Sequence, residues 1–402
     1  MVTISNLQNG EGGIANQRAY ETGSYPPAFL EYAWYLSVFY AMLGGALGIV
    51  IPLLGTGTLV LVAAGCFLSM GNHSSRVYRP VALALSTGIL MGIIQLVFHE
   101  WSQRASAESI FIVQWLAMLI AAQPLSLRPG FLQRFALIAL AIGITCLPFI
   151  SLKADGGIMR ATAVGTGMNA NGLGMWFGFC TVYFIFWGLQ SQKPILRAAS
   201  WTTALGCFYV VALTVSRAPV LAIILAGLVG FRSALKRSFV PVLLLVLLIS
   251  LIYVSGVFDD EINYYTNRGA EKTGRETLFT VAIERIIDSP WIGVGLGEIQ
   301  IYRGAGKQLK NPHNGLLHIT LGAGIIPLIC FLGYLARVAI GSLRIMERVQ
   351  AGEAALVPPL VAFALFEIMI LDYTFMSPWT VVIFALAAGA IQAEGRRRSI
   401  TA

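Results

Sequence analysis

Charged side chains are scarce in this sequence. Lysine, arginine, aspartate and glutamate together make up 11% of its 402 residues, whereas soluble domains carry about 25%. Hydrophobic residues make up 57%, and they gather in runs of about 17–22 residues, each long enough to cross roughly 30 Å of hydrocarbon. The composition therefore excludes an ordinary water-soluble enzyme and predicts an all-α, polytopic integral membrane protein.

The sequence also lacks features that mark other classes of protein. Its five cysteines all lie in apolar runs, so we expect neither a disulfide framework nor a thiolate metal site. The first 28 residues contain no apolar run, and we expect no cleavable signal peptide. The glycine-rich stretch 293–297 lacks the lysine of a phosphate loop. We interpret it as a turn, and expect neither ATP nor another cofactor.

Twelve apolar runs are candidate transmembrane helices of a single membrane domain, residues 1–402. They cover approximately 32–51, 53–70, 80–98, 109–125, 132–151, 171–189, 198–215, 218–231, 239–257, 315–336, 355–371 and 378–393. The one long connection is a loop at 258–314, and we expect short helices within it.

The seventh and eighth runs have almost no linker between them. From residue 198 to residue 231 the only charged side chain is Arg217. One helix over this stretch would extend roughly 50 Å, too long for a single crossing, and Pro219 disfavours a continuous helix. We expect a hairpin with Arg217 at its tight turn. Whether its short second arm crosses the membrane or re-enters is left open.

The distribution of basic residues predicts the orientation. With a cytoplasmic N-terminus, sixteen lysines and arginines fall on the cytoplasmic side and four in the short outer loops. An excess of positive charge is typical of cytoplasmic loops. We therefore expect both termini in the cytoplasm and the long loop outside. Because the net charge of +8 is spread over these gaps, it does not indicate a nucleic-acid partner.

Four ionisable side chains are predicted at the outer rim of the membrane: Arg160, Arg217, Arg275 and His313. Ionisable groups in or near hydrocarbon are costly, and they are functional candidates for that reason. A guanidinium binds phosphate oxygens in a bidentate fashion, and a neutral imidazole accepts a proton near pH 7. The set suits the handling of a phosphorylated lipid.

Each candidate also has a simpler interpretation. Arg217 could snorkel to lipid headgroups. Arg275 could be a solvated loop charge, although it opens an amphipathic helix that we expect to lie on the membrane. A lone histidine is more often structural than catalytic, but Pro312 and the Asn314-Gly315 pair place His313 directly before a predicted span.

The order of these motifs resembles the O-antigen ligase/polymerase superfamily over roughly residues 160–335. The matching pieces are N-x-N (Asn169, Asn171), S-R at the tight turn (Ser216, Arg217), R-x-x-L-F…P-x-x-G-x-G-x-G (275–297) and P-H-N-x-x-L…G (Pro312 to Gly324). The chain departs from the family pattern at Gly322, where an acid is common, and at Pro327. Glu367 or Asp372 could supply the missing acidic support.

The resemblance implies a metal-independent, inverting glycosyltransferase of the bacterial inner membrane with a periplasmic active site. Its donor would be a glycan on undecaprenyl diphosphate, and a ligase would use a hydroxyl of the lipid A–core oligosaccharide as acceptor. Arg217 and Arg275 would then bind the diphosphate, and His313 would take the acceptor proton. Residues expected to help bind the diphosphate or glycan are Arg160, Asn169, Asn171 and Asn314.

Other functions remain open at this point. A glycan polymerase would use the same donor, but polymerases often carry two large outer loops. A transferase that modifies proteins usually adds a soluble region after its last span. A secondary transporter would show internal symmetry and binding groups near the midplane, whereas the polar residues here gather at one surface. These comparisons favour the ligase.

Overall fold

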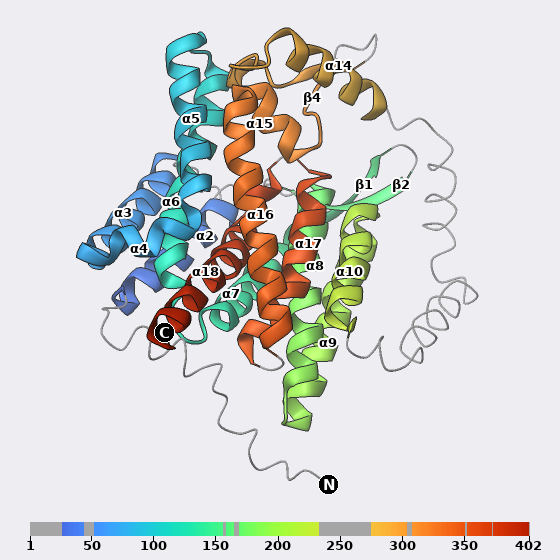
Figure 1. Cartoon of the computed structure of the whole chain (residues 1–402). Coiled ribbons are helices and arrows are strands. Elements are labelled where there is room, and N and C mark those ends of the chain that lie inside the picture. The colour runs from blue at the N-terminus through green and yellow to red at the C-terminus, as the bar shows by residue number, and fades with distance from the viewer. Residues whose placement is uncertain are drawn as a thin grey trace.

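The computed structural model describes residues 26–43, 52–155, 158–164, 169–232, 275–303, 308–349, 352–371 and 373–401. This part of the chain is mostly helical (Figure 1). In Figure 1, α14 (Arg275–Asp288) and the short strand β4 (Gln308–Lys310) lie at one end of the bundle. The C-terminus and the start of α9 (Pro194–Leu213) lie at the other.

The remaining helices follow the apolar runs. They are α2 (Ala28–Leu43), α3 (Pro52–Met70), α4 (Ser74–Tyr78), α5 (Ala82–Phe98), α6 (Gln103–Leu125), α7 (Phe131–Cys146), α8 (Ala170–Gln190), α10 (Arg217–Gly230), α15 (Gly315–Ala323), α16 (Ile325–Arg348), α17 (Val357–Ile368) and α18 (Pro378–Thr401). Short 3₁₀ helices that matter below are η5 (Leu296–Glu298), η6 (Glu353–Leu356) and η7 (Thr374–Met376).

Six helical segments in the described part of the chain are long and apolar enough to cross a membrane. They are Ser74–Phe98, Gln103–Leu125, Phe131–Phe149, Ala170–Gln190, Pro194–Leu213 and Ile325–Glu347. Shorter apolar helices cover Gly55–Met70, Arg217–Gly230 and Pro378–Ala390. The predicted span 239–257 lies outside the described residues. The membrane class is thus supported, and the count of twelve spans stays a prediction.

The exposed surface of the bundle is unusually apolar. Leu61, Leu96 and Leu205 are each more than 70% exposed, and many other large aliphatic side chains lie on the surface with them. The interior is packed with aromatic rings, among them the fully buried Trp115 and Trp379. Soluble monomers rarely expose apolar patches of this extent, so this surface suits contact with lipid.

The predicted span 315–336 is not one helix in the structure, because Gly324 divides it into α15 and α16. Gly324 has φ +82°, and a Cβ atom there would lie 2.2 Å from the carbonyl oxygen of Trp291. The amide of Ile325 donates to the carbonyl oxygen of Pro290 at 2.9 Å. The helix is therefore interrupted where the end of the long loop packs against it.

Two antiparallel hairpins were not anticipated by the all-α prediction. In the larger, β1 (Ile150–Asp155) pairs with β2 (Ile158–Ala163), and Asp155 lies opposite Ile158. In the smaller, β3 (Ile301–Arg303) pairs with β4. The larger hairpin had a signal in the sequence, since two glycines separate its strands and Gly-Gly is a common two-residue hairpin connection.

Candidate functional site

The turn between α9 and α10 packs against two glycines of α8. A Cβ atom on Gly174 would lie 3.0 Å from both Pro219 Cγ and Thr214 Oγ1, and one on Gly178 would lie 3.6 Å from Pro219 Cβ. Because Gly174 lacks a side chain, the turn packs directly on the second turn of α8, whereas the closest neighbour of a Cβ atom on Gly178 is Phe363 of α17, at 2.8 Å.

Arg160 reaches this turn from strand β2. Its Nε donates to the carbonyl oxygen of Thr214 at 3.0 Å, and its Nη2 donates to Asn171 Oδ1 at 3.1 Å. The same Asn171 oxygen accepts a hydrogen bond of 3.0 Å from Ser216 Oγ. One side-chain amide thus joins the hairpin, the first turn of α8 and the residue before Arg217.

Arg217 is the first residue of α10 and is half-buried. The structure therefore brings Arg160, Asn171 and the backbone that carries Arg217 to one place. Asn169 has a different structural role. It is the N-cap of α8, and its Oδ1 accepts a hydrogen bond of 2.9 Å from the amide of Gly172.

Two non-glycine residues in the described part of the chain have positive φ angles: Val215 at +49° and His313 at +52°. This region is uncommon for side-chain-bearing residues, and for a β-branched valine it is a true outlier. Strained residues of this kind persist only where the surroundings hold them, and they cluster at functional sites. One lies two residues before Arg217, and the other is the predicted base itself.

His313 is fixed on its C-terminal side by Asn314. Asn314 caps α15, and its Oδ1 accepts hydrogen bonds from the amides of Leu316 and Leu317 at 2.9 and 3.1 Å. Its Nδ2 donates to the carbonyl oxygen of Met369 at 2.9 Å. The buried side chain of Asn314 thus ties the start of α15 to the end of α17 and leaves His313 half-buried beside it.

The other side of His313 is fixed by a chain of polar groups that the sequence reasoning missed. Asn311 Nδ2 donates to the hydroxyl oxygen of Tyr373 at 3.0 Å, and the Tyr373 hydroxyl donates to Glu108 Oε1 at 2.7 Å. His318 Nε2 lies 3.7 Å from the other oxygen of Glu108. The available signal was Glu108, an acid that the predicted boundary of 109–125 left just outside the span.

Glu367 and Asp372 were the acids expected to replace the family acid, and that expectation stays a prediction. Glu367 is fully buried in the last turn of α17, and Asp372 lies outside the described residues. A Cβ atom on Gly322 would lie 2.9 Å from Leu296 Cδ2, so apolar packing occupies the place of an acid there. Glu108 lies 3.7 Å from His318, which is one helical turn before Gly322.

The glycine-rich stretch 293–297 forms a turn, as we interpreted it from the sequence, and this turn packs against neighbouring helices. The amide of Val294 donates to the carbonyl oxygen of Leu321 at 2.7 Å, and the amide of Leu296 donates to Gln95 Oε1 at 2.7 Å. A Cβ atom on Gly293 would lie 2.3 Å from the Leu321 oxygen. The turn therefore attaches the long loop to α5 and α15.

Arg275 begins α14, and its side chain lies outside the described residues. The helix itself is two-sided. Leu278 and Ala282 are buried where α14 packs on α15 and β3, whereas Ile283 and Ile287 are 50% and 70% exposed. Trp291, just after the helix, is 65% exposed. This outward apolar face suits a helix that lies on a membrane surface.

The two strained segments, at Val215 and at His313, both lead into helices that are in contact with α17. The segment that carries Arg217 leads into α10, which packs against α17 and α8. The segment that carries His313 leads into α15, which is tied to the end of α17 through Asn314. Guanidinium groups can bind an anionic leaving group, and an imidazole can remove a proton from a hydroxyl.

Comparison with known families relates one part of the chain to a known family. Residues 202–332 match the O-antigen ligase family. The matched stretch is about a third of the chain, and it contains Arg217, Arg275, His313 and Asn314. None of the curated proteins compared with the chain matches it.

The match confirms the resemblance to O-antigen ligases over that stretch. It indicates a membrane enzyme of the O-antigen ligase or polymerase type, which transfers glycans and works with lipid-linked partners. Arg160, Asn171 and Glu108 lie outside the matched stretch. Their connection with the O-antigen ligase motifs rests on the hydrogen bonds described above.

Proposed function

We propose that this protein is an O-antigen ligase. It would move a glycan from undecaprenyl diphosphate to a hydroxyl of the lipid A–core oligosaccharide at the periplasmic face of the bacterial inner membrane. The observation that carries the proposal is the strained backbone at Val215 and His313, within the stretch that matches the O-antigen ligase family. Both termini would lie in the cytoplasm, as the charge distribution predicts.

In the proposed reaction, the acceptor hydroxyl oxygen attacks the anomeric carbon of the donor glycan. The bond from that carbon to the diphosphate oxygen breaks, and the electron pair leaves with undecaprenyl diphosphate. His313 takes the hydroxyl proton as the new glycosidic bond forms. Such a direct displacement inverts the anomeric centre.

The arginines would stabilise the departing group. Negative charge grows on the leaving diphosphate, and preorganised cations lower the energy of that transition state. Arg217 and Arg275 are the proposed partners of the diphosphate, with Arg160 beside them. Asn169, Asn171 and Asn314 are proposed to hold the diphosphate or glycan directly or through the arginines. Because side chains would supply the positive charge, the mechanism needs no metal and no ATP.

The proposal is tested with purified protein in nanodiscs, a labelled undecaprenyl diphosphate glycan and lipid A–core acceptor. Arg217→Ala should lower the transfer rate by roughly 10²–10³, as removal of one anion-stabilising donor does elsewhere. His313→Ala should abolish measurable transfer. Arg104→Ala is the matched control, because Arg104 is an exposed arginine to which no role in transfer is assigned. Full activity of both the Arg217 and His313 variants would end this mechanism.

A deletion strain separates ligation from polymerisation. Loss of a ligase leaves core-only lipopolysaccharide while long glycan accumulates on its lipid carrier. Loss of a polymerase leaves the core with a single repeat unit. A pattern of the second kind would assign the same donor chemistry to the polymerase reaction. Uptake of a labelled solute into proteoliposomes, without glycan transfer, would instead favour a transporter.

A further inference from the structure

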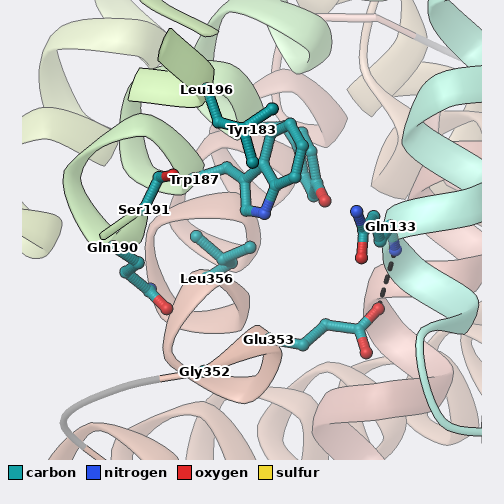
Figure 2. Close-up of a pocket in the computed structure, with 9 residues that line it drawn as sticks. All are labelled: Gln133, Tyr183, Trp187, Gln190, Ser191, Leu196, Gly352, Glu353 and Leu356. Carbon is teal, nitrogen blue, oxygen red and sulfur yellow. Dashed lines mark hydrogen bonds between the residues drawn. The ribbon is translucent and has the colours of Figure 1, made fainter. Parts of the chain in front are cut away.

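A cavity of about 270 Å³ lies at the opposite end of the bundle from the α9–α10 turn. It is formed where α8 ends and α9 begins, and α9 has 20 residues, which makes it roughly 30 Å long. Figure 2 shows the cavity between α8, η6 and the first turn of α7. None of the residues assigned to glycan transfer lines it.

Glu353 supplies the negative charge of this cavity. Its two oxygens accept hydrogen bonds from the first turn of α7: Oε1 from the amide of Gln133 at 2.7 Å, and Oε2 from the amide of Gly130 at 3.0 Å. A carboxylate oxygen has more than one acceptor site, so Glu353 can still receive donors from the cavity. In Figure 2 its carboxylate lies at the edge of the open space.

Tyr183 offers a second polar group. The side chain is fully buried, and its hydroxyl has no hydrogen-bond partner among the described residues. Figure 2 shows the hydroxyl directed across the cavity toward Gln133. A buried hydroxyl without a partner costs free energy, and a polar ligand group beside it would offset that cost.

The walls between these groups are aromatic. Tyr183 and Trp187 lie one turn apart on α8, with ring centroids 6.1 Å apart. A cation over an aromatic face is attracted by the ring quadrupole, and a carboxylate adds a direct charge pair. An anion is disfavoured, because Glu353 already occupies the amides at the start of α7. The cavity thus fits an organic ammonium group with hydrogens to donate.

The rim of the cavity carries positive charge, opposite in sign to the carboxylate of Glu353. Arg197 is exposed, and its Nη2 donates to the carbonyl oxygen of Ser191 at 2.9 Å; Ser191 lines the cavity. Lys193 is exposed beside it. Ile195 is 82% exposed next to Leu196, another lining residue. An ammonium site, a basic rim and exposed aliphatic side chains together match a zwitterionic lipid.

We propose that this cavity binds the headgroup of an aminophospholipid, with the primary ammonium of phosphatidylethanolamine between Glu353, Tyr183 and Trp187. The lipid phosphate lies at Arg197 and Lys193. In this arrangement the three N–H donors of the primary ammonium would be shared among the Glu353 carboxylate, the side-chain oxygen of Gln133 and the Tyr183 hydroxyl, and the fully buried tyrosine would have to turn slightly into the cavity. A trimethylated headgroup has no such donors and leaves the tyrosine hydroxyl unpaired.

Lipid retention measured by native mass spectrometry tests the proposal, with detergent-purified protein and added phosphatidylethanolamine, phosphatidylcholine or phosphatidylglycerol. Phosphatidylethanolamine should be retained at least tenfold more than the other two lipids. Tyr183→Phe and Glu353→Gln should each abolish that preference. Tyr334→Phe is the matched control, because Tyr334 is another buried tyrosine without a hydroxyl partner in the described residues and does not line the cavity.

Soluble phosphoethanolamine and ethanolamine separate a lipid from a free amine. If either compound raises the unfolding temperature of the protein as strongly as the lipid does, the ligand is a soluble amine and the lipid assignment is wrong. Equal retention of the three lipids, or a preference for phosphatidylethanolamine that survives in both Tyr183→Phe and Glu353→Gln, would overturn the site altogether.

Discussion

The hydroxyl of Tyr373 donates a hydrogen bond of 2.7 Å to the carboxylate of Glu108, although 265 residues separate them in the chain. The same hydroxyl accepts a bond from Asn311, two residues before His313. This chain of groups connects α6 with the segment that carries the proposed base. Since His313 holds a left-handed backbone conformation, its neighbours must keep it there, and Tyr373 is one anchor.

Tyr373→Phe should therefore lower the glycan transfer rate by about fivefold, because one anchoring hydrogen bond is worth on the order of 1 kcal/mol. The apparent affinity for donor lipid should change little, since Tyr373 is proposed to position the base rather than bind the diphosphate. Donor titrations with the purified variant separate the two parameters. A rise in the donor KM with an unchanged maximal rate would contradict a positioning role.

The sequence predicted the helices well where apolar runs are uninterrupted, but it could not locate contacts between distant segments. The break at Gly324 depends on the carbonyl oxygen of Trp291, which approaches from the long loop. In the sequence, Glu108 stood just outside a predicted span. Its contact with Tyr373 could not be foreseen, because the two residues are far apart in the chain. Hydropathy shows which face of a helix is apolar. It does not show which loop packs against that face.

For the candidate site, too, the sequence indicated individual residues but not the contacts between them. Arg160, Asn171 and Ser216 stood out as separate motifs, and the structure joins them through one amide oxygen. Asn169 looked equivalent to Asn171 in the N-x-N pattern. The helix begins between them, however, so Asn169 caps α8 whereas Asn171 faces the arginine. That distinction depends on the position of the helix start, which apolar periodicity leaves uncertain by a few residues.

Asn169→Ala and Asn171→Ala should consequently have different effects. Loss of the N-cap in Asn169→Ala should lower the free energy of unfolding by about 1 kcal/mol with a modest effect on transfer. Asn171→Ala removes the oxygen that Arg160 and Ser216 share, and transfer should fall at least tenfold more than in Asn169→Ala. Unfolding temperature and transfer rate measured on both proteins check the contrast. Equal transfer rates in the two variants would refute it.

Gly174→Val should displace the turn that carries Arg217. Even a Cβ atom would lie 3.0 Å from Pro219 Cγ and Thr214 Oγ1, and overpacking of this kind costs about 1–3 kcal/mol. We expect a lower unfolding temperature and loss of most transfer activity. Gly206→Val is the control, because a Cβ atom at that helical glycine meets nothing within 4 Å. If the two variants transfer glycan equally well, the turn does not position the arginine.

The stability of the protein should depend on pH through Glu353. Burial raises the pKa of this carboxyl above its ordinary value of 4.5, although backbone amides of α7 and the charge of Arg134 oppose the rise. Between the ordinary and the raised pKa, the folded protein holds a proton that the unfolded chain has released, so stability falls as pH rises. The contribution is fully present below pH 4.5 and is lost as pH rises through the raised pKa.

Glu353→Gln removes that titration while its side-chain oxygen can still accept a hydrogen bond from α7. The unfolding temperature of the native protein minus that of Glu353→Gln should therefore be largest at low pH and should decrease as the carboxyl ionises. Measurements in detergent without aminophospholipid isolate this effect, because a bound ammonium would favour the ionised carboxylate and weaken the decrease. A difference that is constant with pH, or that grows as pH rises, would show that burial does not dominate the electrostatics of Glu353.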